Sequence, residues 1–168
     1  MKTRDLAFIA LSAVIIALCA QITIPLFAVP FTLQTFAVAL ALFCLGGRRG
    51  TLSVVLYTLM GVCGVPVFSG FRGGIGHLFG ASGGFIFGFI ATALLYWLLY
   101  YAVKNPRLDL LFMLAGLFAC YLCGVLWYAF VFHGARPAAL IIPFVIPDIL
   151  KILLAKLVSS RIKGALKL

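Results

Sequence analysis

Residues 138–158 read AALIIPFVIPDILKILLAKLV, an apolar run with two charged side chains near its middle, Asp148 and Lys151. An ionised side chain at the centre of a bilayer costs about 2.5–3.5 kcal/mol on insertion scales, so such residues rarely face lipid. Their i, i+3 spacing places both on the same face of a helix. The stretch therefore predicts a membrane helix whose charged face meets either a polar partner helix or a ligand.

The rest of the chain has the composition of an integral membrane protein. Of its 168 residues 65% are hydrophobic, and the mean hydropathy is +1.27, whereas soluble domains are about 45–50% apolar. We expect one all-α domain over residues 1–168 with six transmembrane helices. The six expected spans are residues 5–24, 32–45, 51–65, 82–103, 108–132 and 138–158.

The basic residues predict the orientation of these helices. Ten of the thirteen fall before the first span, between spans two and three, between spans four and five, or at the C-terminal end. Since positive loops stay in the cytoplasm, both termini are expected there. The net charge of +10 is then a feature of topology, and nucleic-acid binding is not expected because no basic face with interleaved aromatic residues lies outside the spans.

Few residues offer catalytic or metal-binding chemistry. The chain has three acidic residues, and of these only Asp148 is expected in the outer half of the membrane. The sequence contains no Walker motif, no nucleophile paired with a base, and no cluster of His and carboxylate ligands, so we expect no ATPase activity, cofactor or metal. Three alternatives for Asp148 stay open: a structural ion pair with Lys151, proton coupling in a self-sufficient transporter, and a catalytic base in a membrane enzyme, a role also open to His133.

Two further patterns allow both a functional and a structural interpretation. The glycine-rich segment 70–77 contains Arg72 and His77, which either reach an anionic ligand or are simply solvated. It lacks the spacing of a phosphate-binding loop. Ala13 and Ala17 form a small-residue pair in the first span, which suits close helix packing, either internal or against a partner.

Several ordered motifs resemble the BioY family, the biotin-specific S components of energy-coupling-factor (ECF) vitamin transporters. The resemblance begins with VPFTLQTF at 29–36 and LGGRRG at 45–50. It continues with GVPVF at 64–68, GGIG at 73–76 and FGASGGF at 79–85, and ends with PDILK at 147–151. Many family members have Tyr where this chain has Phe85, and many carry Arg near the position of His77.

The resemblance implies a function and partners. It implies a non-enzymatic transport subunit of a prokaryotic cytoplasmic membrane that binds biotin from outside. Such a subunit works with a transmembrane T component and two cytoplasmic ATPases. The small residues Ala13 and Ala17 resemble the surface that S components offer to the T component.

The resemblance and the chemistry of biotin together suggest a ligand site. Asp148 can accept from the ureido N–H groups, and Lys151 can serve either the ureido oxygen or the carboxylate. An apolar site with few polar anchors is the usual solution for such a molecule. The expected ligand-contacting residues are Asp148, Lys151, Gln34, Phe31, Phe68, Arg72, His77 and Phe85.

Overall fold

The computed structural model describes residues 2–25, 29–131 and 141–166. Helices dominate this part of the chain, and a short antiparallel hairpin pairs Thr23 with Thr32 and Ile24 with Phe31. The elements in chain order are α1 (Thr3–Gln21), β1 (Thr23–Ile24), β2 (Phe31–Thr32), α2 (Gln34–Val62), α3 (Ile75–Leu78), α4 (Gly83–Val103), the 3-10 helix η1 (Pro106–Leu108), α5 (Asp109–Val131) and α6 (Ile142–Leu166).

The element α2 contains the second and third expected spans and reverses direction inside its length. Gly46 interrupts the helical backbone with φ 76° and ψ 176°, a conformation open essentially only to glycine. Gln34 and Tyr57 share a hydrogen bond of 2.9 Å although they are 23 residues apart. An unbroken helix would separate them by about 35 Å. Residues 34–45 and 47–62 are therefore two arms of an antiparallel pair, with Gly50 packed on Leu42.

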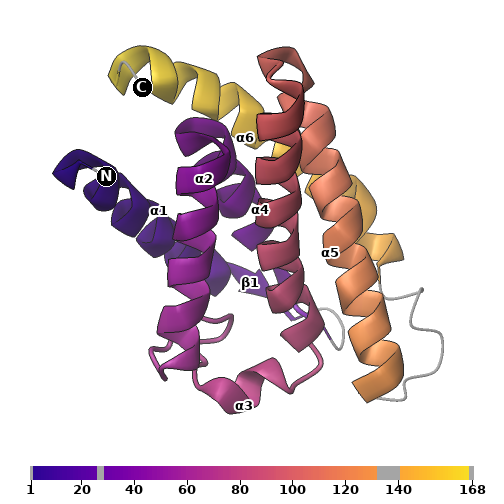
Figure 1. Cartoon of the computed structure of the whole chain (residues 1–168). Helices are drawn as coiled ribbons and strands as arrows, with labels where there is room; N and C mark the ends of the chain where they lie inside the picture. The colour runs from indigo at the N-terminus through magenta and orange to yellow at the C-terminus, as the bar shows by residue number, and fades with distance from the viewer. Residues whose placement is uncertain (1, 26–28, 132–140, 167–168) are drawn as a thin grey trace.

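The helices pack into one bundle around α2 (Figure 1). The view shows α4 and α5 side by side, and their interface depends on glycine: a Cβ on Gly88 would lie 2.8 Å from Cys120 Sγ, and one on Gly84 would meet Trp127. On the other side of the bundle α1 and α6 pack against α2. The start of α1 and the end of α6 lie at the end of the bundle opposite α3.

Four helical segments of the described chain are long and apolar enough to cross a membrane: Thr3–Gln21, Gln34–Val62, Gly83–Val103 and Pro106–Val131. The prediction of a multi-pass, all-α membrane protein is confirmed at this level. The expected start of the last span at residue 138 and the expected end of the fifth at 132 lie outside the described residues, as does His133.

Candidate ligand-binding site

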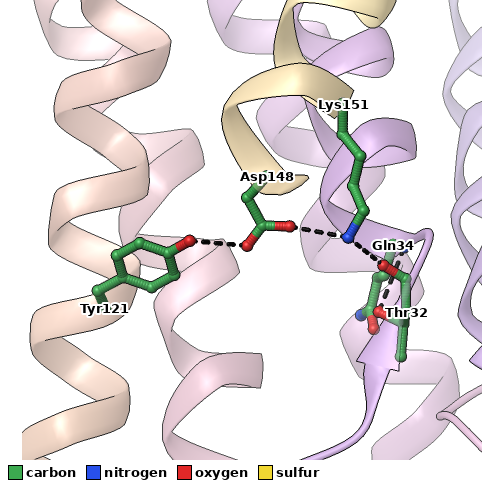
Figure 2. Close-up of polar contacts among 5 residues, drawn as sticks. All are labelled: Thr32, Gln34, Tyr121, Asp148 and Lys151. Carbon is green, nitrogen blue, oxygen red and sulfur yellow. Dashed lines mark hydrogen bonds and ion pairs between the residues drawn. The ribbon is translucent and has the colours of Figure 1, made fainter. Parts of the chain in front are cut away.

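Asp148 and Lys151 form a buried ion pair on α6 (Figure 2). Lys151 Nζ lies 2.8 Å from Asp148 Oδ1, and the two residues are 8% and 4% exposed. Tyr121, on α5, donates a hydrogen bond of 2.8 Å to the other carboxylate oxygen, Oδ2. Burial of two charges is tolerated only when their mutual attraction is joined by further hydrogen bonds, as it is here.

The ammonium group of Lys151 has two more partners from the hairpin that precedes α2. It donates a hydrogen bond of 2.6 Å to the main-chain carbonyl of Thr32. It also lies 3.6 Å from the centroid of the Phe31 ring, which stacks on Phe144 from α6. A desolvated cation over an aromatic face gains about 2 kcal/mol. Lys151 thus holds strand β2 against α6.

A cavity of about 60 Å³ opens beside this pair. Its polar wall includes Asp148, Lys151 and Gln34, and the remaining wall is mostly apolar. Gln34 begins α2 and donates from Nε2 to Tyr57 on the opposite arm. The apolar lining residues are Val29, Pro30, Phe85, Ile86, Phe89, Leu117, Cys120 and Phe144. An apolar cleft with a few convergent polar groups is the usual form of a small-molecule site.

Comparison with known proteins places this chain in a family. The BioY family model matches residues 1–168, the whole chain. The chain belongs to the BioY family. A probable biotin transporter BioY of Pyrococcus horikoshii is 37% identical over 98% of this chain and 99% of its own length. The biotin transporter BioY of Thermotoga maritima is 40% identical over 95% and 96% of the two chains.

A solved structure has the same fold. It is the crystal structure of the S-component for biotin from an ECF-type ABC transporter, with a TM-score of 0.86. The alignment covers 98% of this chain and 95% of that one at 23% sequence identity. The motif-based assignment to the BioY family is confirmed by the family model and by these relatives, and the solved structure confirms the fold.

The BioY chain brings together most of the expected ligand residues, but not those of the glycine-rich segment. Asp148, Lys151, Gln34 and Phe85 line the cavity, and Phe31 covers the ammonium group of Lys151. The other three expected residues, Phe68, Arg72 and His77, are not among its lining residues.

Phe68 instead packs between α2 and α3. It is 1% exposed, packs edge-on against Tyr57 and stacks on His77 at 5.3 Å between ring centroids. His77 Nε2 lies 3.3 Å from the hydroxyl of Ser82, which does line the cavity. Burial, and secondly the nearby Arg72 guanidinium, hold the pKa of His77 below its usual range, which favours the neutral ring.

The expected partner surface on α1 needs correction at one position. Ala13 is completely buried in the bundle core, so it offers no surface to a partner in this structure. Ala17 is half-buried. The small side chain of Ala13 serves internal packing, and the outward face of α1 carries larger side chains, including Leu11, Val14 and Leu18.

Two hydrogen-bonding partners of the ion pair were not expected from the sequence. Tyr121 lies 27 positions from Asp148, and Thr32 reaches Lys151 through its main-chain carbonyl, while its hydroxyl accepts from the main-chain nitrogen of Gln34 at 3.3 Å. A buried tyrosine hydroxyl needs a hydrogen-bond partner, so Tyr121 in an apolar span was a usable signal. A main-chain contact such as that of Thr32 has no side-chain signature.

Proposed function

We propose that this chain is the biotin-binding S component of an ECF transporter. Membership of the BioY family supports this, as do the names of relatives with full-length alignments. The observation that carries the proposal is the buried pair of Asp148 and Lys151 beside an apolar cavity. The ureido group of biotin carries two N–H donors and a carbonyl acceptor, which complement a carboxylate and an ammonium.

The contact between Lys151 and Thr32 supports a specific pose. Lys151 already donates to an amide carbonyl at 2.6 Å, and the carbonyl of a urea is chemically similar. We therefore place the ureido oxygen at Lys151 and a ureido N–H at Asp148. A cavity of 60 Å³ is far smaller than the roughly 300 Å³ of a typical small-molecule pocket. Binding must then widen the site. The ligand carbonyl would replace the Thr32 carbonyl as the acceptor at Lys151, and this exchange would release the hairpin from α6.

The proposed transport role depends on how the chain crosses the membrane and on partner proteins. We infer six transmembrane segments, with the two arms of α2 counted separately and α6 as the last. Both termini would face the cytoplasm, because most basic residues lie on that side. A T component and two cytoplasmic ATPases would supply the energy, since the chain has no ATPase motif. The exposed apolar face of α1 suits the T component.

Equilibrium binding to the purified protein tests the proposal. Biotin should bind one to one and raise the unfolding temperature, since a ligand at 100 times its Kd stabilises the native state by about 2.7 kcal/mol. Substitution of Asp148 and Lys151 provides the negative control. The absence of any thermal stabilisation by biotin in large excess would contradict the assignment.

Reconstitution in liposomes separates the two transport mechanisms. An S component should accumulate biotin only with the T component and ATPases present and ATP inside the vesicle. Uptake by this chain alone, driven by a pH gradient, would instead support proton coupling through Asp148.

A further inference from the structure

A chain of hydrogen bonds runs from the cavity to the segment between α2 and α3. Gln34, which lines the cavity, donates from Nε2 to the hydroxyl of Tyr57 at 2.9 Å. That hydroxyl donates to the main-chain carbonyl of Val67 at 3.4 Å. Gln34 and Tyr57 are 5% and 0% exposed, so water does not compete freely for these groups.

The donor and the acceptor in each of these bonds follow from the chemistry of the last group, the Val67 carbonyl. A carbonyl oxygen can only accept, so the single hydroxyl proton of Tyr57 must go to Val67. The Tyr57 oxygen is then left as an acceptor and requires a donor from Gln34. Only Nε2 of the Gln34 amide can donate, and its carbonyl oxygen Oε1 must therefore point elsewhere. Within the described residues Oε1 receives no hydrogen bond.

The Val67 carbonyl is itself held in place by α1. Gln21, the last residue of that helix, donates from Nε2 to the carbonyls of Val67 at 3.2 Å and Phe68 at 3.1 Å. Its Oε1 accepts from the amide nitrogen of Phe71 at 2.8 Å. One side chain thus ties α1 to a segment about 50 residues away and fixes the acceptor on which the orientation of Tyr57 depends.

We infer that Tyr57 is a positioning residue that orients the amide of Gln34 so that Oε1 faces the ligand as an acceptor. This inference rests on the proposed biotin site and adds to it. The polar wall of the cavity then includes the Asp148 carboxylate and Gln34 Oε1 as acceptors and Lys151 as a donor, beside the hydroxyl-bearing residues Thr35 and Ser82. Such a set selects a ligand with a carbonyl flanked by N–H groups on both sides, and it disfavours analogues in which one N–H is replaced.

A double-mutant cycle tests whether Tyr57 acts through Gln34. Tyr57→Phe removes the hydroxyl alone and should weaken biotin binding about tenfold, because the amide can then rotate (about 1.4 kcal/mol). Gln34→Ala should weaken it at least as much, and the double variant should bind no more weakly than Gln34→Ala. Additive losses, or an unchanged affinity in Tyr57→Phe, would overturn the inference.

A matched control separates this role from loss of a buried hydroxyl in general. Tyr96 is also 0% exposed, and it is not among the residues that line the cavity. Tyr96→Phe should leave biotin affinity within twofold. Biotin methylated on one ureido nitrogen gives a second readout: wild type should discriminate between its two isomers, and Tyr57→Phe should discriminate less. Equal discrimination in both proteins would count against the inference.

A measurement without ligand tests the orientation of the Gln34 amide independently of biotin binding. With the Gln side chains ¹⁵N-labelled, the Gln34 NH₂ group, assigned through Gln34→Ala, should be protected from solvent exchange in wild type. Protection should be lost in Tyr57→Phe and reduced in Gln21→Ala. Equal protection in wild type and Tyr57→Phe would overturn the orientation argument, whether or not the protein binds biotin.

Discussion

Tyr121 donates its hydroxyl proton to Asp148 Oδ2 at 2.8 Å, the carboxylate oxygen that Lys151 does not contact. Each oxygen of the carboxylate therefore has one charge-stabilising partner, one from α5 and one from α6 itself. The Asp148 side chain is fixed in place before any ligand arrives. A preorganised acceptor loses little conformational freedom on binding, which favours affinity.

Tyr121→Phe should lower both stability and ligand affinity. The substitution leaves Asp148 Oδ2 without its donor, and hydrogen bonds to charged groups contribute about 1.5–3 kcal/mol. We expect a fall of that size in the free energy of unfolding and at least a tenfold rise in the Kd for biotin. Tyr101→Phe is the control, because Tyr101 is 71% exposed and keeps its ring under Lys104. Equal effects of the two variants would show that the hydroxyl of Tyr121 has no special role.

Substitutions at the ion pair should affect protein stability and biotin binding differently. Removing one partner, as in Lys151→Ala, leaves a buried unpaired charge and should cost about 3–5 kcal/mol. The double variant Asp148→Asn, Lys151→Met should recover much of that stability because no charge remains buried. Biotin binding should be lost in both proteins. If the double variant still bound biotin tightly by calorimetry, the pair would be purely structural.

The sequence predicted the membrane class and the main charged pair because their physics is local. Apolar runs and an i, i+3 pair of opposite charges can be recognised without knowledge of the tertiary fold. The same reasoning placed two spans at residues 32–45 and 51–65, and the structure shows them as arms of one bent element. The bend lies at Gly46, whose backbone is non-helical inside that element.

Contacts across long sequence separations were harder to predict. Phe68, Arg72 and His77 were expected as ligand residues, but Phe68 pairs with Arg72 in an antiparallel bridge and stacks on His77, and none of the three lines the cavity. The distance of these three residues from the cavity depends on the path of residues 64–82, which local sequence patterns do not reveal. Ala13 shows the same limit, since a small residue in a helix suits an internal or an external interface, and only the packing decides.

His77 should make stability depend on pH in the acidic range. Its pKa in the native state is lowered below the ordinary value of 6.5 by burial and by Arg72. As pH falls below 6.5 the unfolded chain therefore binds more protons than the native protein, and the unfolding free energy decreases. The decrease ends once the pH is below the native pKa. The unfolding temperature of His77→Gln should fall less between pH 7 and about pH 5.

A control for this prediction comes from the neighbouring cation. Arg72→Gln removes one cause of the lowered pKa, so the pH dependence should become shallower than in wild type while His77 remains. Parallel curves for wild type and His77→Gln would show that other groups produce the acid sensitivity.

Gly46→Ala tests whether the reversal of α2 depends on backbone conformation alone. A Cβ at Gly46 would have no atom within 4 Å, so the substitution introduces no clash. The φ of 76° with ψ of 176° nevertheless strains any residue other than glycine, at a cost of about 1–3 kcal/mol. Gly76→Ala is a matched control, because its Cβ also meets open space and its φ lies outside the left-handed region. We expect a lower unfolding free energy only in Gly46→Ala. Because the reversal aligns Gln34 with Tyr57, biotin affinity should fall in the same variant, and equal stability of the two variants would contradict the argument.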